Sequence, residues 1–304
     1  MSENDRWVRP FGRSAAEGYT VSVTPGEPGW DHTGLLVADL DAGGSRALET
    51  GECEYVVVPL CGAVRVEAVD AEGERHTADL TGRPSVFAGP TDVAYVPKGA
   101  SLTVSSADGA RVALALARAG KRERPLPFRH VLPDEVPVEL RGAGQASREV
   151  RNFGTPQVLD ADSIIACEVL TPAGNWSSYP PHKHDEECGG EETALEEIYY
   201  FELQPTDDAP QGAEPLAYQR VYGTSERAID VLAEVRTGDV VLIPHGWHGP
   251  AMAPPGYDLY YLNVMAGPGP ERAWLIRDDP RHAWVRGTWD AQQVDPRLPF
   301  GGER

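Results

Sequence analysis

Residues 180–184 read Pro-Pro-His-Lys-His, and they begin a spaced series of metal-ligand side chains that ends at His248. In an extended strand, residues two positions apart point to the same face of the sheet. We therefore expect His182 and His184 to project together into one cavity, while Lys183 points away from it. The two prolines restrict the backbone just before the first histidine.

Two further segments complete this series. Residues 197–201, Glu-Ile-Tyr-Tyr-Phe, have the β-branched and aromatic composition of a strand. Residues 240–243, Val-Val-Leu-Ile, form a second apolar run, and Pro-His-Gly-Trp-His follows at 244–248. Three imidazoles and a carboxylate from neighbouring strands suit a divalent metal. The predicted ligands are His182, His184, Glu197 and His248.

Two of these predicted ligands have a competitor close by. Glu196 precedes Glu197 at the start of the same strand. Glu197 is the better placed, because it opens the hydrophobic run and Glu196 then faces the opposite side of the sheet. His245 competes with His248, and the residues alone do not decide between these two imidazoles.

The composition limits the classes of function. The chain has 304 residues and a formal net charge of −20, which opposes binding to nucleic acid or to an anionic membrane. The four cysteines form no Cys-x-x-Cys pair, so neither a structural zinc site nor a redox motif is indicated. The polar N-terminal segment lacks the apolar core of a signal peptide, and no apolar run reaches the length of a membrane span. We therefore expect a cytoplasmic protein.

Short hydrophobic segments separated by turn residues predict an all-β protein. In the first half these segments are residues 20–23, 35–39, 55–58, 63–69, 93–96, 102–104 and 112–117. A charged, proline-rich stretch follows, and we place a domain boundary within residues 118–150. The predicted domains are residues 1–130 and 131–304, each a β-sandwich or jelly-roll barrel. Short helices are expected only near residues 228–232 and 283–289.

The two halves resemble each other in sequence. Residues 92–99, Asp-Val-Ala-Tyr-Val-Pro-Lys-Gly, are similar to residues 239–246, Asp-Val-Val-Leu-Ile-Pro-His-Gly. Residues 54–66 also have the pattern of a strand, a tight turn and a second strand. The first half has no His-x-His, so a duplicated N-terminal barrel would have no metal ligands and would serve as packing and as an oligomer surface.

Longer phrases resemble one known family. The order His-x-His, Glu, then Gly-(five residues)-Pro-x-Gly-x-His is similar to the two cupin motifs, although the spacing from His184 to Glu197 is longer than usual. Residues 179–187, 195–201, 219–222 and 255–267 resemble 5-deoxyglucuronate isomerase of inositol catabolism. That family is bicupin, and it is related to the uronate isomerase of pectin breakdown. Its pattern favours His248 over His245 as the third imidazole.

The resemblance implies an aldose–ketose isomerase that converts 5-deoxy-D-glucuronate to 2-deoxy-5-keto-D-gluconate. Such a reaction moves a proton between adjacent carbons through an enediol, and a Lewis-acid metal that holds the carbonyl and hydroxyl oxygens stabilises its charge. One divalent metal per chain is expected, Zn or Mn, with Fe or Ni as alternatives. The expected partner is a small-molecule sugar acid, and the expected assembly is a homo-oligomer.

The sequence also offers candidates for proton transfer and substrate binding. The catalytic candidates are Tyr261, Lys183 and Tyr222, with Asp185 and His245 as further alternatives. Arg220 is the expected partner of the substrate carboxylate, because a guanidinium binds a carboxylate through two hydrogen bonds. The expected donors to the sugar hydroxyls are Tyr179, Tyr260 and Asn263.

Three other functions stay open from the sequence alone. A metal-dependent dioxygenase uses the same ligand set, but it needs dioxygen, so full activity on a uronate without oxygen excludes it. A sugar-acid sensor or storage protein would bind its ligand without turnover. The related pectin-pathway isomerase shares both chemistry and ligands, so neither fold nor metal site separates the two activities.

Overall fold

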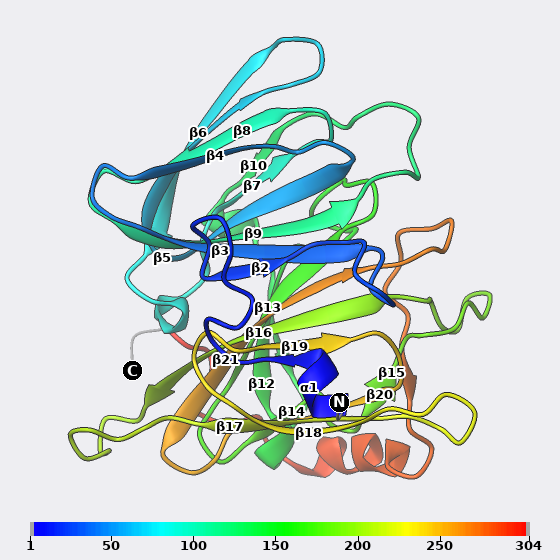
Figure 1. Ribbon diagram of the computed structural model, residues 1–304. Helices are drawn as coiled ribbons and strands as arrows, with labels where there is room; N and C mark the ends of the chain where they lie inside the picture. Colours follow the sequence, from blue (N-terminus) through cyan, green and yellow to red (C-terminus); the bar gives the residue numbers. More distant parts are fainter. Residues whose placement is uncertain (1–2, 302–304) are drawn as a thin grey trace.

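The computed structural model describes residues 3–301 and shows two β-barrels stacked on each other (Figure 1). The N-terminal barrel, blue to teal in Figure 1, lies above the C-terminal barrel, which is green to red. The helices are short: α1 (Glu3–Trp7) and the 3₁₀ segments η1 (Val86–Ala88), η2 (Pro133–Glu135), η3 (Gly144–Ala146) and η4 (Ala283–Ala291). The prediction of an all-β protein with two barrels and few short helices is confirmed.

The N-terminal barrel is built from one connected nine-stranded sheet. Its strands are β2 (Val21–Val23), β3 (Thr33–Leu40), β4 (Ser45–Glu49), β5 (Cys53–Val69), β6 (Arg75–Arg83), β7 (Val93–Val96), β8 (Ser101–Ser105), β9 (Ala110–Arg118) and β10 (Arg129–Val131). The first part of β5 pairs with β7 and β9, and its second part pairs with β6 and β8. The predicted tight turn within residues 54–66 is therefore wrong. A register shift between Pro59 and Cys61 accompanies the change of partners within one continuous strand.

The C-terminal barrel consists of two facing sheets. The seven-stranded sheet contains, in spatial order, β1 (Val8–Arg9), β19 (Val240–Ile243), β16 (Glu196–Pro205), β21 (Tyr257–Ala266), β13 (Ile165–Thr171), β12 (Arg148–Gly154) and β11 (Val138–Arg141). The six-stranded sheet contains β18 (Asp230–Val235), β17 (Ala217–Tyr222), β20 (Trp247–Met252), β15 (His182–Lys183) and β22 (Arg277–Asp278), with β14 (Trp176–Ser177) paired to β20. Because β1 pairs with β19, the N-terminal segment belongs to the C-terminal barrel.

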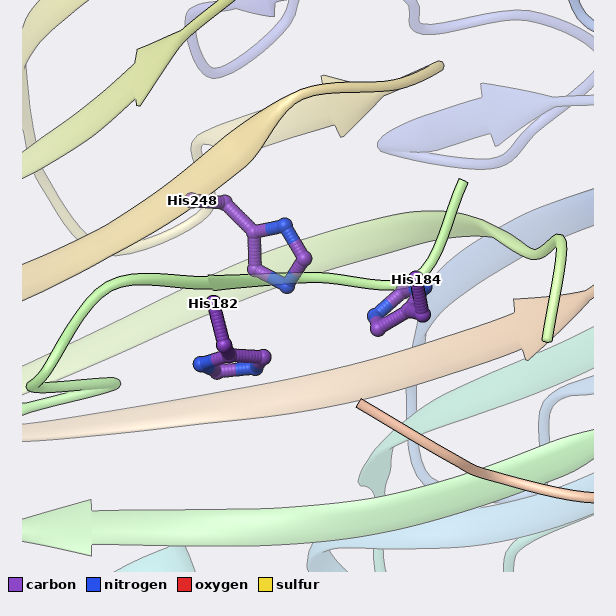
Figure 2. Close-up of side chains that lie close together, drawn as sticks. All are labelled: His182, His184 and His248. Carbon is purple, nitrogen blue, oxygen red and sulfur yellow. The ribbon is translucent and has the colours of Figure 1, made fainter. Parts of the chain in front are cut away.

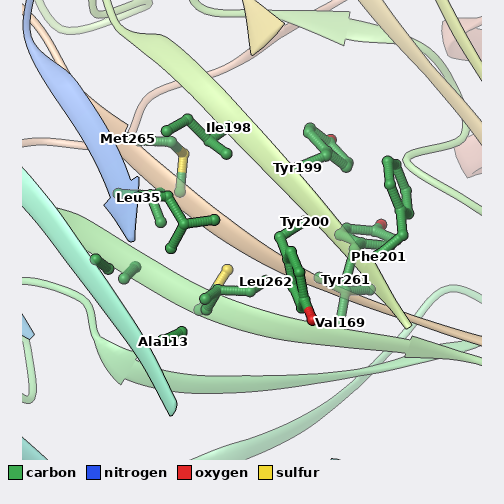
Figure 3. Close-up of a cluster of buried hydrophobic side chains, with 14 of the residues drawn as sticks. Leu35, Ala113, Val169, Ile198, Tyr199, Tyr200, Phe201, Tyr261, Leu262 and Met265 are labelled. Carbon is green, nitrogen blue, oxygen red and sulfur yellow. The ribbon is translucent and has the colours of Figure 1, made fainter. Parts of the chain in front are cut away.

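The seven-stranded sheet has a different role on each face. On one face, β16 and β21 contact β3 and β9 of the N-terminal barrel. Figure 3 shows Leu35 and Ala113 of that barrel gathered with Ile198, Tyr200 and Leu262 in one buried hydrophobic cluster. Alternation along the strands then turns the intervening side chains toward the interior of the C-terminal barrel. This interior face carries the candidate site.

The pairing pattern supports the similarity between the two halves. β5 pairs with β7 and β9 in the same way that β16 pairs with β19 and β21. Tyr55 lies opposite Val96, and Glu197 lies opposite Ile243. Val96 and Ile243 each come directly before the Pro-x-Gly that the two halves share. Position 54 therefore corresponds to position 196, and position 55 to position 197.

Two equivalent carboxylates join the barrels reciprocally. Glu54 accepts the backbone N–H groups of residues 162–164 at 2.6–2.8 Å, and it also accepts the hydroxyl of Tyr95 at 2.6 Å. Glu196 accepts the backbone N–H groups of residues 31–33 at 2.6–3.0 Å. Both side chains are buried. A carboxylate that accepts several amide hydrogen bonds is well stabilised, so each one fixes a loop of the opposite barrel.

The interior of the N-terminal barrel is apolar where the C-terminal barrel has polar ligands. Tyr55 occupies the position of Glu197, and Val57, opposite Leu114, occupies that of Tyr199. All three N-terminal residues belong to a second hydrophobic cluster of the described chain. These substitutions fill the space in which a metal and a substrate would bind.

One expectation about local structure needs correction, namely the short helix near residues 228–232. Residues 230–235 form β18 and not a helix, because Val231, Ala233 and Val235 alternate with exposed residues and face the core. The expected helix at 283–289 is present as η4. The segment 118–150, read as a boundary region, contains β10, β11 and the start of β12. The division at residue 130 stays a prediction. No helix in residues 3–301 is long and apolar enough to cross a membrane.

Candidate metal centre and its cavity

His182, His184 and His248 converge inside the C-terminal barrel (Figure 2). One ring nitrogen from each lies within 4.8 Å of the others. The antiparallel pairing of β15 with β20 sets His182 directly opposite His248, and their ring centroids are 4.4 Å apart. The ring of His184 lies 4.7 Å from that of His248. All three side chains are buried.

Glu197 joins this group from the facing sheet. Its Oε2 lies 3.1 Å from His184 Nε2 and 3.1 Å from His248 Nε2. Glu196 points to the N-terminal barrel, where it binds backbone amides. The structure thus brings the four predicted ligands together, and their binding of a metal stays a prediction.

Backbone carbonyl groups orient two of the imidazoles. His184 Nδ1 lies 3.3 Å from the carbonyl oxygen of Leu195, and His248 Nδ1 lies 3.1 Å from that of Gly246. Because a carbonyl oxygen only accepts hydrogen bonds, we assign the ring proton to Nδ1 in both residues. Each Nε2 then directs its lone pair at Glu197. Metal-binding histidines are commonly oriented in this way by an acceptor behind the ring.

These donor atoms fit a divalent cation. His248 Nε2 is buried and has no hydrogen-bond partner in the described part of the chain. A nitrogen lone pair and a carboxylate oxygen repel each other unless a proton or a cation lies between them. Donor atoms roughly 3 Å apart are the neighbours expected around an ion with bonds of about 2.1 Å. The group can therefore hold a metal, and its donors do not select one element.

For His182 and Glu197, the electrostatics of the site favour the protonation states that metal ligands need. Burial, and then the neighbouring His248 and His184, lower the pKa of His182 well below its usual value. Burial would raise the pKa of Glu197, but His184 and His248 outweigh this effect and lower it. Glu197 in turn raises the pKa of His184 against the effect of burial. A proton and a metal therefore compete for the position between these two side chains.

Two of the four predicted ligands, His182 and Glu197, line a cavity of about 170 Å³. Alternate residues of β12, β13, β16 and β21 line its wall on the seven-stranded sheet, as expected for one face of a sheet. These residues are Arg148, Val150, Val169, Glu197, Tyr199, Tyr261 and Asn263. Each water-sized site needs roughly 10–15 Å³ of such space, so the cavity accommodates about a dozen non-hydrogen atoms. A six-carbon sugar acid has this size.

Three hydroxyl groups form a chain in this cavity. Ser178 Oγ lies 3.0 Å from the hydroxyl of Tyr199 and 3.1 Å from that of Tyr261. Ser178 has a φ of 48°, which is unusual for a residue other than glycine. Burial raises the pKa of Tyr261 to about 12. Tyr261 therefore stays protonated at neutral pH and can donate a hydrogen bond to a substrate oxygen.

The structure places several predicted site residues outside the cavity. Lys183 Nζ binds Asp185 at 2.6 Å and Glu192 at 2.8 Å, so it faces the acidic loop. The Tyr222 hydroxyl donates to Asp279 at 2.6 Å. Alternation along β15 turns Lys183 away from the two histidines on either side of it. Neither candidate for proton transfer is therefore positioned to reach a substrate in this cavity.

Only one of the four predicted substrate-binding residues lines the cavity. Asn263 lines the cavity, whereas the Tyr260 hydroxyl points to the N-terminal barrel and donates to Glu168 at 2.8 Å. Arg220 pairs with Asp230 at 2.5 Å on the neighbouring strand. Tyr179 lies in an adjacent groove beside η4. The assignments of Arg220, Tyr179 and Tyr260 therefore do not fit the cavity.

Two alternatives from the sequence also lie elsewhere. Asp185 accepts hydrogen bonds from Lys183 and from the backbone N–H of Gly246. His245 is half-buried and is not part of the cavity wall. Gly246, with a φ of 95°, reverses the chain between His245 and the strand that carries His248. A Cβ at this glycine would lie 2.8 Å from the Tyr222 carbonyl oxygen, so the turn requires glycine.

The sequence reasoning missed the cations of the cavity. Arg141, Arg148 and Arg286 all line it. Arg148 lies in a segment of alternating charge that resembles an exposed connection, and only its pairing within the seven-stranded sheet buries it. The signal in the sequence was the two-residue spacing of Arg148 and Val150, which places both side chains on one face of a strand.

Known proteins with similar sequences were found over most of the chain. The model of the KduI/IolB family matches residues 7–285. A 5-deoxy-glucuronate isomerase of Geobacillus thermodenitrificans is 42% identical over 270 residues, which cover 88% of this chain and 92% of that protein. The protein of the same name from Bacillus subtilis is 36% identical over 264 residues, covering 86% and 91% of the two chains.

Solved structures give a consistent result. The crystal structure of an IolB-like protein from Salmonella typhimurium has a TM-score of 0.80 and 34% identity, and the match covers 92% of this chain and 98% of that one. Oxalate decarboxylase of Lactobacillus farciminis has a TM-score of 0.61 and 14% identity, with coverage of 90% and 88%. The second similarity shows a shared fold.

Proposed function

This chain belongs to the KduI/IolB family, and we propose that it is a 5-deoxyglucuronate isomerase. In this role it converts the aldose 5-deoxy-D-glucuronate to the ketose 2-deoxy-5-keto-D-gluconate during myo-inositol catabolism. The observation that carries the proposal is the convergence of three buried imidazoles and Glu197 beside a cavity that His182 and Glu197 line. The relatives named 5-deoxy-glucuronate isomerase support the choice of substrate.

The reaction moves one hydrogen from C2 to C1 and one from O2 to O1. His182, His184, Glu197 and His248 would hold the metal, for which we propose Zn or Mn. A bound divalent cation supplies Lewis acidity toward the carbonyl oxygen and the adjacent hydroxyl oxygen. The buried position of the ligands and the apolar side chains of the cavity limit the access of water to the enediol.

Tyr261 is the proposed catalytic residue among those predicted from the sequence. Its hydroxyl, the hydroxyl of Ser178 and the hydroxyl of Tyr199 form the chain described above. Each hydroxyl accepts one hydrogen bond and donates another. The chain can therefore take up a proton at one end and release one at the other end, as the transfer from O2 to O1 requires.

A direct test follows the reaction in deuterated water. The purified full-length chain is analysed for bound metal and incubated with 5-deoxyglucuronate, and the product is identified by NMR. We expect one metal ion per chain, formation of 2-deoxy-5-ketogluconate, and deuterium at the hydroxymethyl carbon C6 of the product, which is C1 of the substrate. The rate should be the same without oxygen, which separates this activity from that of a dioxygenase. Binding of the substrate without any product would contradict the proposed function.

Replacing Tyr261 with phenylalanine tests the hydroxyl chain. We expect kcat to fall about 100-fold, because proton transfer through a positioned side chain contributes at least this much. Metal content should not change, since Tyr261 is not a ligand. Tyr260→Phe is the matched control, because it removes a hydroxyl from the other face of β21 and should leave kcat unchanged. An unchanged kcat in Tyr261→Phe would rule out this role.

A further inference from the structure

Arg148 is a buried cation without a carboxylate partner. It begins β12, is 5% exposed and lines the cavity beside the metal ligands. Its Nη1 donates to the carbonyl oxygen of Ala146 at 3.0 Å, and its Cζ lies 5.5 Å from the centre of the Trp289 ring. No carboxylate of residues 3–301 lies within ion-pairing distance of this guanidinium. Most of its five N–H donors therefore remain available to a ligand.

The two neighbouring arginines, unlike Arg148, each have a carboxylate partner. Arg141 lies opposite Arg148 in the β11–β12 pair and donates to Glu139 at 2.7 and 2.9 Å. Arg286 reaches the cavity from η4 and donates to Asp278 at 2.7 Å. Burial, and then the charge of Arg141, lower the pKa of Arg148 to about 10. Arg148 is thus still charged at neutral pH, and its charge has no counter-ion.

Several contacts hold this cation in place. The Trp289 ring lies near both guanidinium groups, with its centre 5.5 Å from Cζ of Arg148 and 5.1 Å from Cζ of Arg286. Gly142 has a φ of 78°, and a Cβ there would lie 2.7 Å from Arg148 Nη1. A buried and unpaired charge destabilises a fold. An arrangement that keeps such a charge fixed at a cavity wall is typical of a binding site for an anion.

We propose that Arg148 binds the carboxylate of the substrate and thereby selects sugar acids over neutral sugars. This inference rests on the proposed function and goes further, because it assigns the anion-binding residue of the cavity. A guanidinium binds a carboxylate through two parallel hydrogen bonds, and the buried setting strengthens them. The positive charge near the cavity also attracts an anionic substrate to a chain whose net charge is −20.

The position of Arg148 also orients the substrate. In 5-deoxyglucuronate, the carboxylate and the reacting carbons C1 and C2 lie at opposite ends of the molecule. With the carboxylate at Arg148, the aldehyde end extends along the cavity toward His182 and Glu197, which line the same space. Val150 follows Arg148 by two residues on the same face and pairs with Val169. These apolar side chains adjoin the carbon that lacks a hydroxyl, where a 5-hydroxyl would find no hydrogen-bond partner.

Binding without turnover tests this inference most directly. The probe is 5-deoxyglucuronate reduced at C1 with borohydride, which keeps the carboxylate and cannot isomerise. Its neutral counterpart has CH2OH in place of the carboxylate. Titration calorimetry measures both compounds with the full-length, metal-loaded chain and with the variants Arg148→Met, Arg148→Lys and Arg220→Met. Arg220→Met is the matched control, because it removes an arginine that lies outside the cavity.

We expect Arg148→Met to weaken binding of the acid about 100-fold, the loss expected for a buried charge-assisted pair. Binding of the neutral compound should be unchanged. Arg148→Lys should recover part of the affinity, because it restores the charge but not the paired geometry. Arg220→Met should bind both compounds as the wild type does. The melting temperature of Arg148→Met without ligand should equal or exceed that of the wild type, because an unpaired buried charge is removed.

Two results would overturn the assignment of Arg148. One is wild-type affinity of Arg148→Met for the acid. The other is an equal loss of affinity for both compounds together with a lower melting temperature, which would indicate a structural role. If the wild type fails to isomerise 5-deoxyglucuronate but binds the acid through Arg148, the proposed function fails and the anion site stands. If the wild type isomerises it and Arg148→Met keeps the same KM, the anion site fails and the function stands.

Discussion

Replacing His248 with alanine is expected to remove the divalent metal and to lower kcat/KM for 5-deoxyglucuronate by at least about a thousandfold. His248 Nε2 is a buried nitrogen with no hydrogen-bond partner in the described chain, and it faces the carboxylate of Glu197. Its loss would leave two imidazoles and one carboxylate, which bind a cation less tightly than four donors. Mass spectrometry of bound metal and initial-rate measurements give the two readouts.

His245→Ala is the matched control for this experiment. His245 precedes His248 by three residues, but it is not one of the three imidazoles that converge on the candidate metal site. The control should retain its metal and its rate. The secondary structure of both variants, followed by circular dichroism, should match that of the wild type, because the core is formed by other side chains. Full metal content and wild-type rates in His248→Ala would refute the metal site.

The adjacent carboxylates Glu196 and Glu197 should respond to mutation in opposite ways. Glu197→Gln keeps the shape of the side chain but removes the charge that faces His184 and His248. We expect loss of metal and a fall in kcat/KM of at least about a thousandfold. The melting temperature should stay close to that of the metal-free wild type, because Glu197 makes no contact with the other barrel of the kind that Glu196 makes.

Glu196→Gln should instead weaken the contact between the barrels. The carboxylate accepts three consecutive backbone N–H groups, and an amide presents an NH2 group to some of these donors. Leaving buried donors unpaired costs about 3 kcal/mol, which corresponds to a decrease in melting temperature of about 5–10 °C. Metal content should not change. A Glu196→Gln variant that loses metal and keeps its melting temperature would reverse the assignment of the two faces.

Local pattern sufficed to predict much of the fold. Val240–Ile243 and the strand that starts at Glu196 are both present, because runs of β-branched and aromatic side chains fit a buried pleated surface. The prediction was wrong where a pattern has two readings. A short helix was expected near residues 228–232, although residues 230–235 have the alternation of a strand. Pro59 to Gly62 has turn composition, yet in the structure these residues lie within one continuous strand, β5.

Local sequence pattern also predicted only part of the candidate site. Alternation placed His182 and His184 on one side and Lys183 on the other, and the structure agrees. Alternation could not tell which side of a sheet becomes a cavity. Arg220 was therefore chosen as the anion-binding residue, although its strand turns it toward Asp230. Tyr260 and Tyr261 are adjacent in sequence, and only the packing of β21 against the N-terminal barrel decides which one faces the cavity.

The sequence by itself determined the β class of this protein and the common direction of His182 and His184, because both follow from side-chain type and from a two-residue period within single segments. The tertiary structure alone decided that Glu197 meets the imidazoles of His184 and His248. It alone also decided that Arg148 is buried at the same cavity without a partner. Burial and convergence depend on the pairing of strands far apart in the chain, and no local period encodes that pairing.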